Sequence, residues 1–565
     1  MDFFRGSRML RVMKRIVILG GGFGGIYAAR HLEKLFKRER DFYEIVLVNR
    51  ENYFTYQPML AEVVAGSLGI LEPVSSLRSL VKNTTIYVRE ISDINIANQT
   101  VTLSPNFHHT DLIISYDHLI LALGNVTDFR NSSGGLHEHA LPFKNLKDAI
   151  KLRNHIIDVL ESALIEPDLS VRKQLLTFVV GGGGFSGVEI VAEINDLVRS
   201  FAKKHPSISP EEIRVILAHR KEHLVDKELS YSLGDYAETL LKNRGVEIFF
   251  HAELISATPH EAILDDGRRI PTSTIVGTAP ANTNPLIENL PLEKLTGRLK
   301  TDSFLKVSGT TNVWALGDCA YVPIFESTRI SPPTAQFAVR QGKTLAHNIF
   351  ATCHNKELKP FSFKGLGTMT SLGYRKAVAE IFGKIKLSGF FAWILWRAVY
   401  WSKLPGISRK VRVGLSWILD MFMPQELVQL KAEVHDGITH LHYAKGETIF
   451  RKGDVGDFLY IIVKGKIEVI EVLNNLETRI ATLNKGEYFG EMALLNQQKR
   501  AATVRCAEDT ELLAIRKHDF HVLVTNFGSL REEFQKMEAF RTQKLHSITD
   551  LGNILHFPED EAHHG

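Results

Sequence analysis

The chain has 565 residues, too many for one hydrophobic core, and we expect about three domains. With 44% hydrophobic and 23% charged residues it is globular in composition, and a net charge of +4 gives no indication of a nucleic-acid partner. The three cysteines, Cys319, Cys353 and Cys506, lie far apart, which argues against a redox-active dithiol and fits a reducing compartment. We expect no signal peptide and no membrane span, because no apolar segment has the required length and flanks.

Two glycine-rich turns are the most informative feature of the sequence. Each follows an apolar, strand-like run and precedes a helical pattern. The spacing G-x-G-x-x-G occurs twice, at Gly20, Gly22 and Gly25 and again at Gly182, Gly184 and Gly187. The first glycine permits a tight turn, the second lets the backbone approach a pyrophosphate, and the third lets the helix pack on the strand. Two such turns predict an α/β protein with two dinucleotides, so that electrons can pass from one to the other.

The position after the second strand of each unit departs from the usual pattern. An acid there usually accepts hydrogen bonds from ribose hydroxyls, but here Asn49 follows the strand predicted at 43–48. Asparagine can still accept through its carbonyl oxygen, so we keep the site. The strand predicted at 215–218 ends at His219-Arg220-Lys221, where a cation could pair with a 2′-phosphate. This favours tolerance of NADPH, with a solvated turn as the alternative.

Two later strand-like runs end in glycine. Residues 116–124 end at Gly124, and residues 312–318 end at Gly317-Asp318. Asp318 by itself would suit a turn or a helix N-cap. Beside two nucleotide-binding turns, it becomes a candidate cofactor ligand.

The composition changes between residues 381 and 419. This stretch contains most of the tryptophans and many lysines and arginines, but no Asp or Glu. In the second half, apolar residues recur at helical spacing, namely Ile407, Val411, Leu415, Ile418 and Phe422. The cations Arg409, Lys410 and Arg412 fall mostly off that face. Such helices suit the headgroup layer of an anionic membrane, and a hairpin packed on the enzyme or between subunits is the alternative.

After residue 424 the pattern changes to short strands with glycine turns, as in a small β-barrel or jelly roll of about 100 residues. Within it, residues 489–495 suggest a short helical turn that offers backbone N–H groups and the Glu491 carboxylate. Arg500 stands just before a strand. A ribose and a charged phosphodiester need that combination of groups.

Together these motifs resemble the type II NADH dehydrogenases, the single-subunit NADH:quinone oxidoreductases of the two-dinucleotide flavoprotein superfamily. The resemblance runs from about residue 13 to 430 and includes, besides the glycine turns, the runs 52–60, 139–146, 317–320, 332–336 and 375–380. It implies FAD at the first turn, with Asp318 on the ribityl chain, and NAD(P)H at the second turn. It also implies that Glu189 lies near the contact between nicotinamide and flavin. The alternative role of Glu189 is a first-turn acid favoured by the helix dipole.

One family signature differs in this chain. The quinone-side motif A-Q-x-x-x-Q is represented by Ala335-Gln336, followed four residues later by Arg340, with Gln341 next to it. Arg340 could donate to a quinone carbonyl or polarise the flavin. The candidate catalytic residues are Glu189, Gln336, Arg340 and Gln341, and we expect no metal. The candidate cofactor-binding residues are Gly20, Gly22, Phe23, Gly24, Gly25, Asn49, Arg50, Gly124, Gly182, Gly184, Phe185, Ser186, Gly187, Glu189, His219, Arg220, Gly317, Asp318, Ala335 and Gln336.

The C-terminal domain resembles cyclic-nucleotide-binding domains. Gly490-Glu491 and Arg500-Ala501-Ala502-Thr503 match the phosphate-binding cassette, in which Glu binds the ribose 2′-hydroxyl and Arg binds the cyclic phosphate. Alanine directly after the arginine resembles cassettes that prefer cAMP. The candidate residues are Gly490, Glu491, Met492, Ala493, Arg500, Ala501 and Ala502. A degenerate domain kept for assembly is the alternative.

We therefore predict FAD- and NAD(P)H-binding Rossmann-like domains in residues 13–375, the second of them at about 172–285. Membrane-anchoring helices are predicted at 376–424 and a jelly-roll domain at 435–545. The predicted function is reduction of a membrane quinone by NAD(P)H through FAD, without proton pumping and under cyclic-nucleotide control, at the cytoplasmic face of the inner (plasma) membrane. The alternatives are a soluble NAD(P)H reductase (diaphorase) for another acceptor and a redox-sensing regulatory flavoprotein. Expected partners are the quinone, an anionic lipid surface and a cyclic nucleotide; a homodimer is left open.

Overall fold

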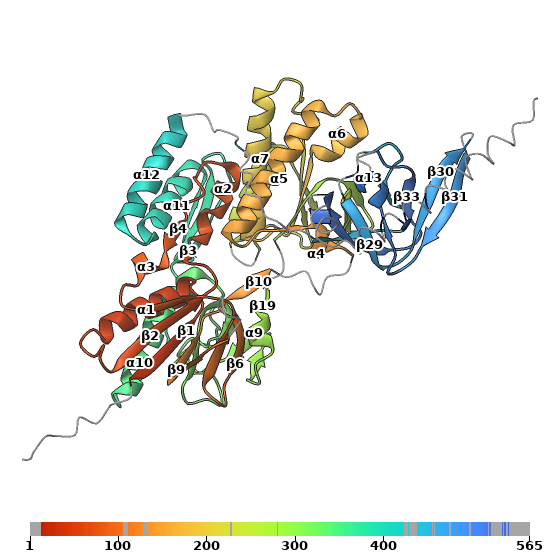
Figure 1. Cartoon of the computed structure of the whole chain (residues 1–565). Coiled ribbons are helices and arrows are strands. Elements are labelled where there is room, and N and C mark those ends of the chain that lie inside the picture. Colours follow the sequence, from red (N-terminus) through yellow and green to blue (C-terminus); the bar gives the residue numbers. More distant parts are fainter. Residues whose placement is uncertain are drawn as a thin grey trace, which may run out of the picture.

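The computed structural model describes most of the chain. The described residues are 13–105, 111–127, 134–226, 229–278, 281–422, 428, 438–454, 456, 458–473, 476–495, 499–517, 519–520, 534, 536–537 and 541. The predicted domain limits at 424, 435 and 545 lie outside them. In chain order the molecule consists of a first α/β unit, a second α/β unit placed within it, two tail helices and a β domain (Figure 1).

The first unit is built on a five-stranded parallel sheet. Its strand order is β22 (Val313–Ala315), β9 (His118–Leu121), β1 (Lys14–Leu19), β2 (Tyr43–Asn49) and β5 (Thr85–Val88). The inner part of β1 is fully buried, as expected for a parallel strand covered on both faces. Helix α1 (Phe23–Leu35) packs closely on α10 (Ala335–Cys353), since a Cβ on Gly342 would lie 2.8 Å from the Gly24 carbonyl oxygen.

The second unit repeats this architecture. Its parallel sheet has the order β11 (Leu141–Pro142), β18 (Thr274–Gly277), β12 (Thr177–Gly181), β13 (Arg214–His219) and β14 (Val246–Phe250). Helices α5 (Leu146–Ile165), α7 (Phe185–Lys204) and α8 (Tyr231–Asn243) accompany it. The strand pair β10 (Asn125–Thr127) and β19 (Ala281–Thr283) joins the units where the chain leaves the first and returns to it. The predicted α/β fold with two dinucleotide-binding units is therefore confirmed as an architecture.

Smaller antiparallel sheets complete both units. They are β6 (Ile91–Asn95), β7 (Thr100–Leu103) and β8 (Leu112–Ser115); β15 (Leu254–Ala257), β16 (Glu261–Leu264) and β17 (Arg269–Pro271); and β24 (Gly367–Ser371), β25 (Ala377–Ile381) and β26 (Ile385–Ser388). The pair β3 (Tyr53–Thr55) and β4 (Val74–Ser76) flanks α2 (Leu60–Ala65), which packs against α5 and α7.

The tail helices α11 (Gly389–Lys403) and α12 (Ile407–Phe422) pack beside α2 (Figure 1). Arg397 holds them there: its guanidinium lies 3.3 Å from a Glu62 carboxylate oxygen and over the rings of Trp393 and Trp417. Trp417 Nε1 also donates to Glu62, at 3.2 Å. Three of the four tryptophans in this stretch therefore pack on the enzyme, with Trp396 as the third, while Trp401 is 40% exposed.

Helix α12 nevertheless leaves its predicted apolar face uncovered. Ile407, Val411, Leu415, Ile418 and Phe422 are each more than half exposed. Of the helices within the described residues, none combines the length and the apolar character needed to cross a membrane. The hairpin is thus packed on the enzyme through both helices, and the outer face of α12 is apolar and exposed.

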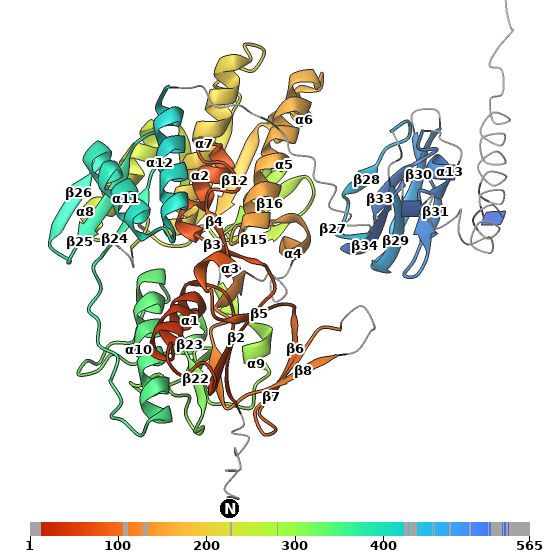
Figure 2. The same cartoon turned by 60° about the vertical axis from the view of Figure 1, so that its left-hand side comes forward.

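The β domain consists of two four-stranded antiparallel sheets, which confirms the predicted all-β C-terminal domain. One sheet has the order β27 (Ile438–Tyr443), β34 (Thr510–Arg516), β29 (Phe458–Lys464) and β32 (Tyr488–Phe489). The other has β28 (Thr448–Phe450), β33 (Thr503–Cys506), β30 (Ile467–Leu473) and β31 (Leu476–Leu483). Figures 1 and 2 show the domain and the tail helices on opposite sides of the second unit.

The glycine turns determine where each helix starts. Helix α1 begins at Phe23, within the first glycine turn, with Gly22 as its N-cap. This is possible because the third glycine, Gly25, lies against the strand: a Cβ there would overlap the Gly20 carbonyl oxygen. Gly187 has the same relation to Gly182 in the second unit.

We predict that Gly25→Ala destabilises the first unit by about 1–3 kcal/mol, the usual result of forcing a methyl group into a filled space. Gly22→Ala is the matched control, because no heavy atom lies within 4 Å of a Cβ at that position. The measurement is the free energy of unfolding by urea, followed by far-UV circular dichroism. Equal stability of the two variants would show that α1 can move away from β1.

Candidate active site

The two glycine turns have nearly the same geometry. Gly20 and Gly182 have φ values of +108° and +106°, which favour glycine. The helix N-caps Gly22 and Gly184 share a φ of −78°. As glycines they have no side chain to accept hydrogen bonds from the first N–H groups of the helix. The first N–H groups of α1 and α7 therefore remain available to an anion, and a Cβ on Gly22 would point into open space. Both turns fit a pyrophosphate.

Asn49 and His219 have one structural role in common. Asn49 Oδ1 accepts a hydrogen bond from Gly21 N at 2.8 Å, and His219 Nδ1 accepts one from Gly183 N at 3.1 Å. His219 Nε2 faces the His223 carbonyl oxygen at 3.0 Å, so the ring donates there. Burial lowers the pKa of His219 and keeps the ring neutral. Each unit thus uses a neutral acceptor to hold its glycine turn, whereas the sequence pattern predicts a ribose-binding role for Asn49.

The neighbouring cations are more exposed. Arg220 Nη1 lies 3.9 Å from Glu253 and Lys221 Nζ lies 2.5 Å from Asp226. Arg50, after Asn49, is similarly exposed, with Glu90 3.9 Å away. Arg220 is therefore the cation best able to turn towards a ligand phosphate.

The turn after β22 closes the first site. Gly317 N donates to Gln341 Oε1 at 2.8 Å, and Gln341 is buried. Burial raises the pKa of Asp318, while Lys144 and Arg298 lower it. Gly124, with φ +65°, follows β9 beside this turn, and a Cβ on it would meet nothing within 4 Å. These groups gather at the carboxyl ends of parallel strands, where α/β sheets bind nucleotides.

Strand β24 links two of the candidate catalytic residues. Gln336, on α10, donates to the Gly367 carbonyl oxygen and accepts from Leu366 N, both at 3.1 Å. Glu189, on α7, accepts from Thr370 Oγ1 at 3.0 Å and faces Ser371 N at 3.4 Å. The two side chains therefore hold opposite ends of one strand, about 13 Å apart at a rise of ~3.3 Å per residue.

Of the other two candidates, Arg340 contacts Gln336 and Gln341 lies apart from both. Arg340 Nη1 donates to the Gln336 carbonyl oxygen at 2.8 Å, and its guanidinium lies 3.9 Å from the centre of the Phe363 ring. Gln341 faces the Gly317 turn, as described above. Gln341 is therefore a positioning residue for the first site, and the four candidates do not form one cluster.

Sequence reasoning named Glu189 but missed Glu193, a buried carboxyl group on the same helix. Burial raises the pKa of Glu189 to about 7 and that of Glu193 to about 8, and each is raised further by the nearby charge of Glu62. Glu189 and Glu193 are one helical turn apart, so an acid pair on the buried face of α7 was the available signal. Burial raises the pKa of Tyr400 of α11, and the charge of Glu189 raises it further.

The cassette of the β domain is assembled around Arg500. Its guanidinium donates to the carbonyl oxygens of Gly490 and Phe458, both at 2.9 Å, and lies over the Phe450 ring. Glu491, at the start of α13 (Glu491–Leu495), is buried and pairs with Arg541 at 2.7 Å. Among the other candidates, Ala493 and Ala502 are buried, Ala501 is exposed and Met492 is half-buried. The two charged side chains that the resemblance assigns are thus adjacent and desolvated.

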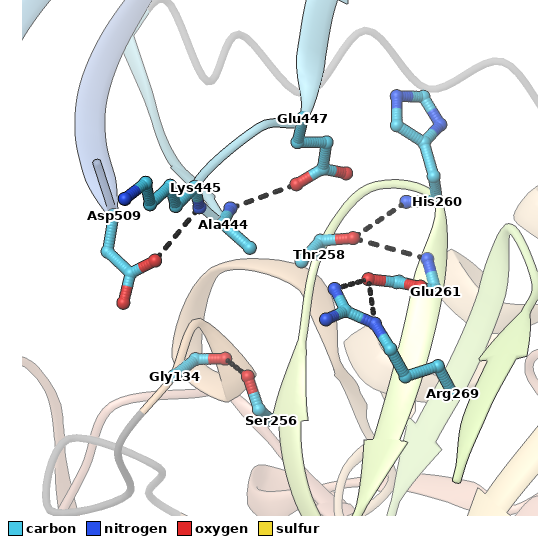
Figure 3. Close-up of polar contacts among 10 residues, drawn as sticks. All are labelled: Gly134, Ser256, Thr258, His260, Glu261, Arg269, Ala444, Lys445, Glu447 and Asp509. Atoms are coloured by element: carbon cyan, nitrogen blue, oxygen red, sulfur yellow. Dashed lines mark hydrogen bonds and ion pairs between the residues drawn. The ribbon is translucent and has the colours of Figure 1, made fainter. Parts of the chain in front are cut away.

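The β domain docks on the second unit through β27 and the following turn. His139, in α4 (Leu136–His139), lies against β27, with its Nε2 2.9 Å from His442 N. Burial lowers the pKa of His139 to about 4, so the ring is neutral, and its Nε2 also lies 2.8 Å from the His442 carbonyl oxygen. Figure 3 shows Glu447 pointing towards Thr258 in the β15–β16 turn. Burial raises the pKa of Glu447, and hydrogen bonds from Ala444 and Thr258 to its carboxylate partly offset this increase.

Within the described residues, no group of His, Cys, Asp or Glu is placed to hold a metal ion. The cysteines Cys319, Cys353 and Cys506 are all free, and burial raises the pKa of Cys319 to about 11. The fold and the two glycine turns therefore define a two-dinucleotide oxidoreductase without a dithiol at the described site.

Sequence profiles of three families match the chain. The pyridine nucleotide-disulphide oxidoreductase family matches residues 14–342, the NDH2 C-terminal domain matches 366–424 and the cyclic nucleotide-binding domain matches 440–527. The demethylphylloquinone reductase NdbB of Synechocystis sp. is 31% identical over 410 residues, which cover 72% of this chain and 95% of that protein. The type II NADH:quinone oxidoreductase Ndh of Mycobacterium tuberculosis is 30% identical over 421 residues, which cover 71% and 87%.

A solved structure has the same fold. NDH2 from Plasmodium falciparum in complex with NADH aligns with a TM-score of 0.68 and 20% identity, over 74% of this chain and all of that one. The chain belongs to the type II NADH:quinone oxidoreductases within the pyridine nucleotide-disulphide oxidoreductase family, and it carries a cyclic nucleotide-binding domain.

We predict that Glu189→Gln changes how stability depends on pH. With a pKa of about 7 in the folded chain against 4.5 as its ordinary value, wild-type Glu189 favours unfolding increasingly as pH rises between these values. The variant should therefore gain up to about 3 kcal/mol relative to wild type over this range and no more above it. Urea unfolding at a series of pH values measures this difference. Glu90→Gln, at an exposed carboxylate, is the control, and a pH-independent difference for Glu189→Gln would contradict the burial of a protonated acid.

Proposed function

We propose that this protein oxidises NADH or NADPH through bound FAD and reduces a quinone at a membrane surface. The observation that carries the proposal is the repeated turn geometry of two parallel sheets, with one strand, β24, held by Glu189 at one end and by Gln336 at the other. FAD, when bound, would supply a group that takes a hydride from the nicotinamide and passes electrons onward one or two at a time.

The residues that would hold each cofactor follow from the geometry. The N–H groups after Gly22 would bind the FAD pyrophosphate, and Asp318, stabilised by Lys144, would accept from ribityl hydroxyls. The N–H groups after Gly184 would bind the NAD(P)H pyrophosphate. No dithiol is required, which agrees with the separation of the cysteines.

Glu189 is suited to hold a proton for quinone reduction, since the quinol product carries two protons that its quinone lacks. With a pKa of about 7, its carboxyl group is part protonated at neutral pH. Thr370 Oγ1 donates to Oε1, which leaves Oε2 to exchange a proton. The quinone would approach along α11, because this helix packs against β24 and the charge of Glu189 acts on its Tyr400.

The exposed apolar face of α12 favours membrane association over the soluble reductase. Its five large apolar side chains would be costly to leave in water but would be buried among lipid headgroups and acyl chains. Cations of the same helix, Arg409, Lys410 and Arg412, would contact anionic lipid. We place the protein peripherally, at the cytoplasmic face of the inner membrane.

We expect purified wild-type protein to contain one FAD and to oxidise NADH with a soluble quinone. Gly22→Glu should abolish both, because its side chain would take the place of the pyrophosphate. The checks are the flavin absorbance spectrum and steady-state NADH oxidation, with circular dichroism to establish folding. Normal flavin content in folded Gly22→Glu would contradict the assignment. Turnover near one per second or slower would favour the redox-sensing alternative.

We predict that His219→Glu raises the preference for NADH over NADPH by about tenfold, which corresponds to ~1.4 kcal/mol of charge discrimination against a 2′-phosphate. His219→Asn is the matched control, because asparagine accepts from the glycine turn at the equivalent position, Asn49. The ratio of kcat/KM values for the two nucleotides measures the effect. An equal ratio in His219→Glu and wild type would remove this position from nucleotide selection.

We also propose that a cyclic nucleotide, with cAMP as the candidate, controls the enzyme through the docked β domain. The sheet that begins with β27 at the docking edge ends with β32, which leads directly to Gly490 and Glu491. Its strand β29 supplies the Phe458 oxygen that Arg500 contacts. A ligand that draws Arg500 or Glu491 away would therefore act on the same sheet that touches His139.

Two short connections lead from this contact to the cofactor sites. The chain runs from His139 to Lys144, whose ammonium contacts Asn125 and lowers the pKa of Asp318. From Thr258, β15 leads back to Leu254, which packs on the Gly181 backbone just before the second glycine turn. The supporting geometry thus favours an effect on cofactor binding rather than on the tail helices.

We predict that Arg500→Ala weakens cAMP binding to the full chain by ten- to a hundredfold, as expected for hydrogen bonds to a charged phosphate. His139→Leu should leave the affinity unchanged but reduce the kinetic response, which we expect at fivefold or more in wild type for a typical coupling of ~1–3 kcal/mol. Calorimetry measures binding, and NADH:quinone kinetics with and without cAMP measure the response. No binding of cAMP or cGMP at millimolar concentration would reject the sensor. Binding without a kinetic effect would reject the coupling.

A further inference from the structure

A pocket of about 440 Å³ lies between the loop after α2, helix α5 and helix α12. Three arginines from two distant parts of the chain line it: Arg153, Arg409 and Arg412. Glu72 is the acid among the lining residues. The pocket is separate from both glycine turns and from the β24 contacts, and nothing in the proposed catalytic cycle uses it.

Arg153 is the buried part of this pocket. It lies on α5, is 7% exposed, and donates from Nη1 to the Val64 carbonyl oxygen at 3.1 Å. Its guanidinium packs flat against Gly66, whose φ of +86° ends α2, and a Cβ there would overlap it. Because Arg153 lines the pocket and is itself buried, a group that enters the pocket is needed to contact its guanidinium directly.

Arg409 and Arg412 form the rim. Arg409 donates to the Leu71 carbonyl oxygen, and its pKa is lowered by burial and by the charge of Arg412. Arg412 has no hydrogen-bond or ion-pair partner among the described residues. Glu72 is engaged by Ser416 Oγ and by Gly69 N, at 2.5 Å for the latter. Three guanidinium groups against one occupied carboxylate leave the pocket positive and suited to an anion.

The surface beside the rim is apolar. Leu71, Ile407, Val411 and Leu415 are all more than half exposed next to Arg409 and Arg412. A ligand that matches both surfaces has a phosphate for the arginines and a hydrocarbon chain for the apolar face. Basic pockets beside membrane-facing helices are typical binding sites for phospholipid headgroups.

We propose that this pocket binds the phosphate of an anionic glycerophospholipid whose acyl chains lie along α12. The proposal rests on the proposed membrane association, since the lipid would come from the bilayer. It adds a specific headgroup site to the general attraction between basic helices and anionic lipid. Because Arg153 joins the loop after α2 to α5, an occupied pocket would also fix the orientation of the enzyme on the membrane.

The test compares vesicles of two kinds with equal surface charge, one containing phosphatidylglycerol and the other containing oleate, which has no phosphate. We expect Arg412→Gln and Arg153→Gln each to weaken binding to the phosphatidylglycerol vesicles about fivefold more than binding to the oleate vesicles, because the loss of general attraction to an anionic surface is the same on both. The matched control is Lys403→Gln, which removes an exposed cation of α11 outside the pocket. This variant should lose the same affinity for both kinds of vesicle. Equal losses of the pocket variants on both kinds of vesicle would overturn the proposal.

A second measurement separates the pocket from membrane association and from free phosphate. Dihexanoyl-phosphatidylglycerol below its micelle concentration should bind the full-length protein, as measured by calorimetry, and should bind Arg412→Gln about fivefold more weakly. Arg412 is exposed, so this variant should fold normally. Inorganic phosphate that binds as well as the short-chain lipid would overturn the lipid assignment. Failure of wild type to bind any vesicle, together with normal short-chain lipid binding, would contradict the proposed membrane association while supporting the pocket.

Discussion

The close approach of a helix to the strand before it is the constraint on which the rest of this molecule depends. At Gly25 and at Gly187 the backbone passes so near a carbonyl oxygen of the preceding turn that a side chain has no room. This contact aims the first N–H groups of α1 and α7 at the space beyond the ends of the parallel strands. It also determines where the next side chains of α7 lie, so Glu189 reaches the end of β24 because the second glycine turn directs the helix there.

A second constraint is the buried charge cluster that attaches the tail helices. Glu62 is buried and would be unfavourable as an isolated carboxylate, but Arg397 and Trp417 both contact it. Because these partners come from α11 and α12, the cluster fixes both helices against α2. Their inner face is then committed to the enzyme, and the apolar face of α12 remains outside together with Arg409 and Arg412. The charges that hold the tail thus also create the surface from which we infer lipid binding.

The position of the β domain keeps the cyclic-nucleotide site apart from the surface that we expect to face the membrane. The domain follows the tail helices in the chain, and sequence order alone would connect it to the membrane surface. In the structure it lies across the second unit, against α4 and the β15–β16 turn. His139 and Lys144 are five residues apart, so the β domain contacts a short segment whose Lys144 lowers the pKa of Asp318. We infer that a cyclic nucleotide and a lipid surface would act on opposite sides of one enzyme.

The sequence by itself determined the features that depend on local spacing. The two glycine turns, the strand–helix alternation, the amphipathic pattern of α12 and the cassette with Glu491 and Arg500 all rest on residues close together in the chain. Only the tertiary structure decided that Asn49 and His219 hold the glycine turns, that Gln336 and Gln341 face different partners, and that three tryptophans of the tail are buried. It alone brought Arg153 to Arg409. These contacts join segments that are far apart in the sequence. They depend on how helices and sheets pack, which the periodicity of a single segment cannot specify.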